Sequence, residues 1–197
     1  MTSMRPLAVA AAVLALSACA SSGGSATTST PSSNTAAPRP VLASTSTVQT
    51  AKVNLTAASG SLVSGTLQVV PIAGGVRVTG EIGGLPRNGN HGFHIHEKGD
   101  CSAADASSAG GHFNPANAPH GRVRQGQHHG GDSDNLSADA KGVARVDRQF
   151  VGVVMGGGAA NDIIGKAVVV HADPDDYTSQ PSGNAGARIA CGVIKAG

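Results

Sequence analysis

Six side chains between residues 92 and 171, with Asp132 beside them, have the types and spacings of metal ligands. They are His94 and His96 in GFHIHE, His112 in GGHFNP, His120 and His129 in a glycine-rich segment ending in HGGD at Asp132, and His171 after AVVV. Imidazole and carboxylate groups are ordinary ligands of zinc and of copper. A set of this size suits two neighbouring metal ions, and we expect one histidine to serve both.

The first pair of histidines predicts a strand with a metal on one face. Side chains alternate along a strand, so His94 and His96 point to one side while Phe93 and Ile95 point to the other. With a rise of about 3.3 Å per residue, the two imidazoles are rooted close enough to bind one ion. We expect the apolar pair to face the core and the metal to lie on the outer wall of a sheet. Residues 98–135 are the expected cover.

The remaining apolar pattern predicts an all-β domain. Aromatic residues make up 2% of the chain, Trp is absent and Gly occurs 28 times, so the core must consist mainly of aliphatic side chains. Alternating apolar positions and turn signals such as Ser59-Gly60 and Gly74-Gly75 predict successive half-buried strands. The expected strands are 53–57, 63–69, 76–82, 91–97, 141–149, 165–171 and 188–195. Two long segments, 98–135 and 172–187, are expected to be functional loops.

Charge argues against nucleic acid as a partner. Residues 49–197 carry 12 Lys and Arg against 12 Asp and Glu, which leaves no net charge. We find no basic stripe of the kind that binds a phosphate backbone.

The N-terminus has the features of an export signal followed by a tether. Arg5 precedes an apolar run that is too short to span a membrane and ends in Leu-Ser-Ala-Cys at Cys19. We expect residues 1–18 to be a lipoprotein signal peptide cleaved before a lipidated Cys19; an ordinary secretory peptide is the alternative. Residues 19–48 are rich in Ser and Thr and predict a disordered tether, and 49–197 is the expected domain. The protein would then be exported to the periplasm or cell envelope, anchored by lipid to the outer membrane.

The other two cysteines fit an oxidising compartment. With Cys19 lipidated, Cys101 and Cys191 are left as a pair, and we expect a disulfide between them. Two unpaired buried thiols are the alternative.

These motifs together resemble the copper/zinc superoxide dismutases, in particular those exported by bacteria. The resemblance covers about residues 50–197 and rests on GFHIHE, GGHFNP, HGGD, VVVHADPDD and GNAGARIACGVI. It implies a Greek-key β-sandwich or barrel, immunoglobulin-like, of about eight antiparallel strands with two long loops over the metal site.

The resemblance also implies a role for each site residue. Copper would be held by His94, His96, His112 and His171, and zinc by His112, His120, His129 and Asp132. His112 would bridge the metals and Arg188 would guide superoxide, which makes these two the expected catalytic residues. Asp175 would hydrogen-bond the outer nitrogens of ligands, with Asp173 and Asp176 as rivals. His91 is expected to be structural, and His128 is the weaker rival of His129.

The expected activity is dismutation of superoxide to O2 and hydrogen peroxide. The alternative is a copper- and zinc-binding envelope protein of the same fold without turnover, and a zinc-stabilised structural lipoprotein is a more distant one. Contact with a membrane is expected only through the lipid. The resemblance also allows a homodimer.

Overall fold

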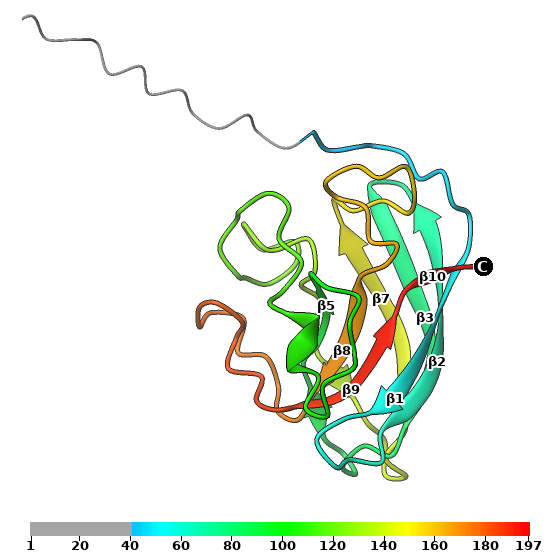
Figure 1. Ribbon diagram of the computed structural model, residues 1–197. Coiled ribbons are helices and arrows are strands. Elements are labelled where there is room, and N and C mark those ends of the chain that lie inside the picture. Colours follow the sequence, from blue (N-terminus) through cyan, green and yellow to red (C-terminus); the bar gives the residue numbers. More distant parts are fainter. Residues whose placement is uncertain (1–40) are drawn as a thin grey trace, which may run out of the picture. The chain divides into compact units, whose positions relative to one another are not determined.

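The alternating segments form antiparallel strands in the computed structural model, which describes residues 41–197 (Figure 1). The expected signal peptide, Cys19 and most of the tether lie outside the described residues. The strands are β1 Ala51–Ala57, β2 Ser64–Ile72, β3 Gly75–Gly83, β4 Asn90–His91, β5 Phe93–His96, β6 Leu136–Ser137, β7 Ala144–Val151, β8 Ala167–His171, β9 Arg188–Val193 and β10 Lys195–Ala196. A short 3-10 turn, η1 Ser107–Ala109, is the one helical element in this part of the chain. No helix within it has the length and apolar character that crossing a membrane requires.

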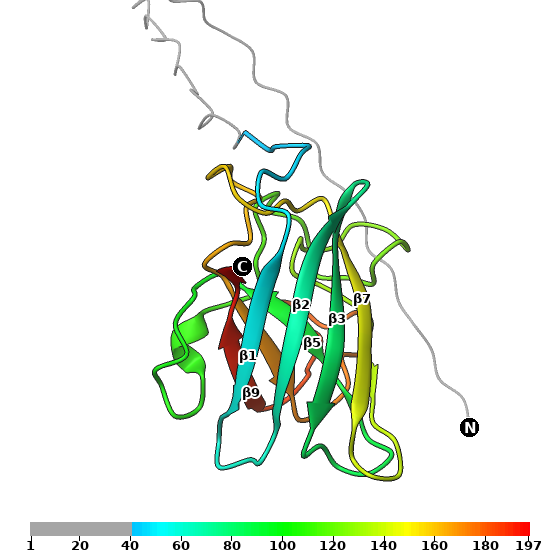
Figure 2. The same ribbon diagram turned by 90° about the vertical axis from the view of Figure 1, so that its right-hand side faces the viewer.

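The main strands form one curled antiparallel sheet with the order β5-β8-β9-β1-β2-β3-β7. Figure 2 shows β9, β1, β2, β3 and β7 in that sequence across one side of the domain, with β5 behind. The short strand β10 pairs with β1, and β4 pairs with β6 as a separate ribbon. The expected all-β sandwich is therefore confirmed.

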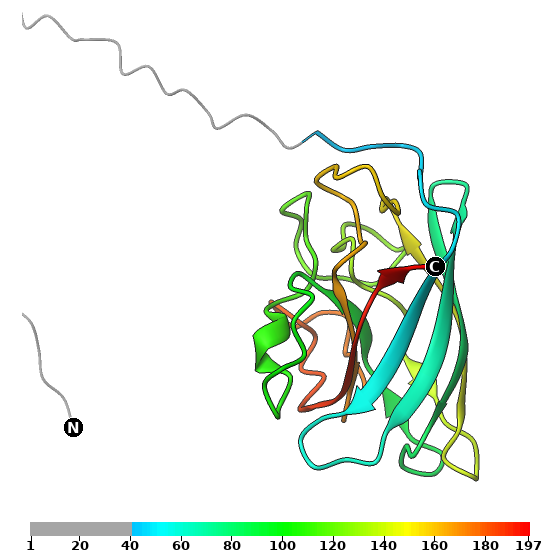
Figure 3. The same ribbon diagram turned by 45° about the vertical axis from the view of Figure 1, so that its right-hand side comes forward.

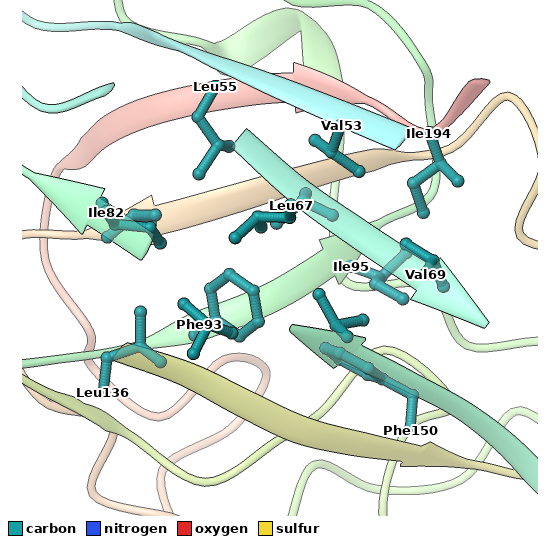
Figure 4. Close-up of a cluster of buried hydrophobic side chains, with 14 of the residues drawn as sticks. Val53, Leu55, Leu67, Val69, Ile82, Phe93, Ile95, Leu136, Phe150 and Ile194 are labelled. Carbon is teal, nitrogen blue, oxygen red and sulfur yellow. The ribbon is translucent and has the colours of Figure 1, made fainter. Parts of the chain in front are cut away.

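The main core, which is mostly aliphatic, fills the space between the two walls of this sheet. Val53, Leu67 and Ile82 come from one wall and are almost completely buried. Phe93 and Ile95 come from the other and are also fully buried, against Phe150 and Leu136 among others (Figure 4). The inward side of the β5 alternation is thus as predicted, and His94 and His96 lie on its opposite face.

Two expected strands are divided in two. Residues 188–195 become β9 and the start of β10. Residues 91–97 were also predicted to be continuous, but β4 pairs with β6 and β5 pairs with β8. The change occurs at Gly92, whose N–H donates to the carbonyl of Asp173 and whose carbonyl accepts from the N–H of His171. Because Gly92 makes these bonds, the start of loop 172–187 is attached directly to the strand that carries the first histidine pair.

The two long loops lie together outside β5 and β8. Figure 1 shows the loop 98–135 (green) and the loop 172–187 (orange) on the same side of the domain, and Figure 3 shows this arrangement from another angle. Loop 98–135 carries three of the six candidate ligand histidines, and both loops cover the outer face of β5, as expected.

Ordered contacts begin before the expected domain boundary at 48/49. Asn161 accepts a hydrogen bond from the N–H of Ala43 and donates to its carbonyl, both at 2.8 Å. Ser46 accepts from the N–H of Met155, and the carbonyl of Met155 accepts from Thr47 and Val48. Residues 41–48 are Ser- and Thr-rich, but their backbone and hydroxyl groups find partners in the loop between β7 and β8.

Candidate metal centre

The first group of histidines is assembled by strand register. In the antiparallel pair β5 and β8, His94 lies opposite Val169 and His96 opposite Ala167. His171 ends β8 on the same side, and its Nε2 lies 3.3 Å from Nε2 of His96. An isolated bridge between His96 and His112 attaches the loop to this edge. One nitrogen from each of four buried imidazoles therefore lies within 4.8 Å of the others: His94, His96, His112 and His171.

The second group is centred on one carboxylate. The Nδ1 atoms of His112, His120 and His129 lie 2.8, 3.1 and 3.3 Å from Oδ1 of Asp132. Oδ2 of Asp132 accepts the backbone N–H groups of Gly121 and His129, which fixes the carboxylate. All four residues are buried, so three imidazoles and one carboxylate converge on a single point.

Four of the nitrogens that point away from these groups are bonded to the protein. Nδ1 of His96 lies 2.9 Å from the carbonyl of Gly110, and Nδ1 of His171 lies 3.3 Å from that of Gly186. Nε2 of His94 and Nε2 of His120 each lie 2.9 Å from an oxygen of Asp175. Because these acceptors take the outer N–H, the inner nitrogens keep free lone pairs.

Several inner nitrogens are buried without a hydrogen-bond partner. They are Nδ1 of His94, Nε2 of His112 and Nδ1 of His120; the last lies near Asp132 but in an orientation that makes no hydrogen bond. Leaving buried polar atoms unpaired is costly. Metal ions would satisfy them, so the donor sets fit metals: four imidazoles in one group, and three imidazoles with a carboxylate in the other.

His112 is the residue common to both groups. Its Nδ1 lies 2.8 Å from Asp132 in the second group, and its Nε2 is the unpaired atom on the side of the first. Its ring centroid is 4.1 Å from that of His94 and 5.4 Å from that of His120. One imidazole thus stands between two ligand sets, which is the arrangement the sequence predicts for the shared histidine.

Asp175 connects the two groups from behind. Its Oδ2 contacts His94 and its Oδ1 contacts His120, and its side chain is fully buried. Its rivals Asp173 and Asp176 are exposed, and Asp176 instead accepts hydrogen bonds from Thr178 and Ser179 within its own turn. Of the three acids in this loop, Asp175 is the one brought against both imidazoles.

Two other histidines lie outside the groups. His91 is buried, and its Nδ1 lies 2.9 Å from the carbonyl of His171. Nδ1 of His128 lies 2.7 Å from the carbonyl of His129. Each ring therefore contacts the backbone carbonyl of a candidate ligand, but neither ring belongs to a ligand group. A structural role was expected for His91.

Glycine at 183 permits the close approach of Asp175 and His120. A Cβ at this position would collide with Oδ1 of Asp175 and would lie 2.8 Å from Nε2 of His120. The residue also has a φ of +69°, which side chains disfavour. A larger residue at 183 would push the two loops apart.

A cleft of about 450 Å³ leads from solvent to the first group. Its lining includes His96, His112, His171, Pro181, Ser182 and Arg188. The Arg188 guanidinium donates to the carbonyls of Ala106 at 2.7 Å and Gly110 at 2.6 Å. The disulfide between Cys101 and Cys191 joins loop 98–135, which holds these two carbonyls, to β9, which begins at Arg188. It confirms the expected pairing.

Burial and neighbouring charges shift the pKa values of the clustered histidines in opposite directions. Burial lowers the pKa of His96, that of His112 to about 4 and that of His171 to about 3, and neighbouring imidazoles add to the effect for each. Burial also acts to lower the pKa of His120, but the nearby carboxylates of Asp132 and Asp175 outweigh it and raise that pKa to about 9. In the metal-free protein His96, His112 and His171 are therefore neutral near pH 7.

These shifts predict how the stability of the metal-free protein depends on pH. Below a pH of about 6.5 the unfolded chain binds protons that His96, His112 and His171 cannot accept when folded. Stability should then fall as the pH falls toward 4, by up to about 1.4 kcal/mol per pH unit for each ring. Folded His120 keeps its proton up to a pH of about 9, so its contribution is lost as the pH rises from 6.5 through 9. Denaturant unfolding should show maximal stability near pH 6.5, and a flat profile from pH 5 to 8 would contradict this prediction.

Sequence reasoning missed the groups that hold the ligands from outside. The carbonyls of Gly110 and Gly186 carry no side-chain signal. Asn135, which exchanges two hydrogen bonds with the backbone of Asp175, and Gln180, which does the same with His120, look like ordinary loop residues in the sequence. Tyr177 was also missed, although it is the single Tyr of the chain; it stacks on Arg122 and accepts from the N–H of Asn135.

Comparison with known proteins shows which family this chain resembles. Residues 63–194 match the family model described as copper/zinc superoxide dismutase. Cu-Zn superoxide dismutase 1 of Aquifex aeolicus (strain VF5) is 42% identical over 134 residues, covering 66% of this chain and 79% of the relative. Cu-Zn superoxide dismutase 3 of Arabidopsis thaliana is 44% identical over 139 residues, covering 67% and 82%. Among solved structures, a SOD-like protein from Bacillus subtilis has 36% identity and a TM-score of 0.66, covering 72% of this chain and 96% of that one. The clock protein EA4 has 37% identity and a TM-score of 0.68, covering 77% and 96%.

Proposed function

Because this chain belongs to the copper/zinc superoxide dismutase family, an oxidoreductase family whose metals are copper and zinc, we propose that it dismutates superoxide outside the cytoplasm. The observation that carries the proposal is the position of His112 between two complete ligand groups, one of which opens through a cleft to a fixed arginine. A protein that only stored metal would need neither the open side nor the arginine.

We assign copper to the group of His94, His96, His112 and His171, and zinc to the group of His112, His120, His129 and Asp132. Four imidazoles suit a metal that changes oxidation state. Three imidazoles and a carboxylate form a closed set typical of structural zinc. The second group is also the one whose members are fixed by backbone donors to Asp132, in keeping with a structural role.

The reaction converts two superoxide anions and two protons to O2 and hydrogen peroxide. A bound copper ion supplies the chemistry by accepting one electron from the first superoxide and giving one electron to the second. Arg188 binds and orients each anion at the mouth of the first group, because its guanidinium is always charged and is held by two carbonyls.

His112 supplies one of the protons. Its Nε2 faces the cleft side of the cluster without a hydrogen-bond partner, while its Nδ1 faces Asp132. When Nε2 takes up a proton, the proton lies at the place where the second superoxide is reduced, and Nε2 can pass it to the product. Asp175 keeps the neighbouring His94 ring oriented through Nε2, so the geometry around His112 stays fixed.

Replacing Arg188 tests its role in guiding the substrate. We expect Arg188→Ala to lower kcat/KM for superoxide at least about tenfold and to weaken its dependence on ionic strength, because steering by a fixed charge accelerates association by about 10–10³-fold. Pulse radiolysis at several salt concentrations measures both. Arg87→Ala, which removes an exposed arginine outside the cleft, is the control and should change neither. Unchanged turnover in Arg188→Ala would contradict the assignment.

We further propose that the protein is exported and lipid-anchored in the cell envelope, where it would protect against superoxide. The disulfide between Cys101 and Cys191 supports an oxidising compartment. In the sequence, the apolar run before Cys19 and the Ser/Thr-rich tether support the anchor. Mass spectrometry of the protein from membranes would show acyl chains on Cys19, and an intact leader would contradict the proposal.

The function as a whole is tested on the purified protein loaded with copper and zinc. We expect rapid superoxide consumption that requires copper. Binding of both metals in full stoichiometry without turnover would instead identify a metal-binding protein of the same fold.

A further inference from the structure

Gln180 makes a reciprocal pair of hydrogen bonds with the backbone of His120. The N–H of His120 donates to Oε1 of Gln180, and Nε2 of Gln180 donates to the carbonyl of His120, both at 2.9 Å. Within residues 41–197 the backbone of His120 has no other hydrogen-bond partner. The carboxamide therefore takes the place of the neighbouring strand that a backbone group would otherwise pair with.

Hydrogen bonds within the turn fix the backbone on both sides of Gln180. The carboxylate of Asp176 accepts from the N–H groups of Thr178 and Ser179, and the N–H of Gly183 donates to the carbonyl of Ser179 at 2.7 Å. Asn184 adds a bond to Oγ of Ser179 at 2.9 Å. Gln180 is exposed, but its backbone is set by these contacts on both sides.

The same turn also holds the His120 ring. Oδ1 of Asp175 lies 2.9 Å from Nε2 of His120. Asp175 therefore contacts the ring of His120 and Gln180 contacts its backbone, and the two residues are five positions apart in one loop. Asn135 in turn exchanges two hydrogen bonds with the backbone of Asp175, at 2.8 and 2.9 Å. Each loop thus uses a carboxamide to fix a backbone on the other.

We infer that Gln180 is a positioning residue that orients His120 for zinc and links the zinc group to the wall of the substrate cleft. The link is direct in the chain, because Pro181 and Ser182 follow Gln180 and line the cleft with Arg188. The side chain of Gln180 contacts no imidazole of the ligand group and does not line the cleft, so its effect passes through the His120 backbone. The inference rests on the proposed function in taking His120 as a zinc ligand.

The test compares zinc release from the wild-type protein, Gln180→Leu and Gln127→Leu, each loaded with zinc alone and challenged with a chelator. Leucine keeps most of the volume of glutamine and removes both hydrogen bonds. Gln127 is an exposed glutamine in the loop that carries His120 and His129, and within residues 41–197 its side chain has no hydrogen-bond partner, which makes it the matched control. We expect release from Gln180→Leu to be about tenfold faster, the lower end of the range for outer partners of a metal ligand, and release from Gln127→Leu to be unchanged.

Hydrogen exchange distinguishes positioning from a general loss of structure. In zinc-loaded Gln180→Leu, the amides of His120 and Ser182 should exchange faster while amides of β2 and β3 keep wild-type rates. Zinc release and exchange equal to the wild type would overturn this inference and leave the proposed function intact. Failure of the wild-type protein to bind zinc would overturn both.

Discussion

His112→Ala should abolish superoxide dismutation while leaving the domain folded. Loss of a partner that merely orients a metal ligand costs about 10–100-fold in metal affinity or activity, and His112 is a member of both ligand groups. We therefore expect activity to fall by more than about 100-fold. The electronic spectrum of the copper- and zinc-loaded variant should also change, because the single imidazole between the two groups is gone.

His128→Ala is the matched control for this variant. His128 is partly buried and adjacent to His129, but its Nδ1 contacts only the carbonyl of His129 among residues 41–197. Activity close to wild type is expected. If His128→Ala lost as much activity as His112→Ala, the assignment of ligands in the HHGGD segment would be wrong. Retention of activity in His112→Ala would contradict the proposed mechanism.

The strands could be predicted because their physics is local. Alternation of Val53 and Leu55 with polar residues marks a half-buried strand whatever its neighbours are, and β1, β2, β3 and β7 lie where this pattern places them. The pattern in β5 also fixed which face carries His94 and His96. It did not reveal the break at Gly92, since the strand changes partners there through bonds to residues about 80 positions later in the chain.

The set of candidate ligands could be predicted because the types and spacing of these residues are informative, while the division into two groups that share His112 came from the resemblance. Most of the surroundings of the ligands could not. Asp175 was expected from the resemblance and lies where that places it, but the residues alone do not single it out, because it has rivals one and two residues away and the choice depends on the path of loop 172–187. Gln180 finds its partner 60 residues earlier in the chain, where two irregular loops meet. Loop paths depend on many weak contacts, and no periodic pattern in the sequence encodes them.

The N-terminal boundary shows the same limit. Residues 41–48 have the composition of a flexible tether. Such a composition indicates that the segment can bury little apolar surface. Residues 41–48 are nevertheless held by polar contacts, which involve Asn161 and Ser46. Asn161, in the loop between β7 and β8, gives no sign in the sequence that its partner is the backbone of Ala43.

Asp175→Asn should weaken zinc binding by about 10–100-fold, the range measured for outer partners of metal ligands. Burial acts to raise the pKa of Asp175, but hydrogen bonds from His120 and His94 outweigh it and hold that pKa well below its usual range. The carboxylate is therefore charged and accepts from both rings. An amide has one oxygen and one NH2 group, so it can accept from one imidazole while its donor faces the other. Competition with a chromophoric chelator measures zinc affinity directly.

Asp176→Asn separates this effect from a change of loop charge. Both acids lie in the same loop and both substitutions remove one negative charge, but Asp176 is exposed and bonds to its own turn. We expect its zinc affinity to stay near that of the wild type. Because Asp175 contacts His94 as well as His120, Asp175→Asn should also alter the copper spectrum, whereas a defect confined to zinc would show that the His94 contact is not needed. If both variants lost zinc affinity equally, the Asp175 carboxylate would act through its charge alone. The connection between the two metal groups would then have to be sought in His112.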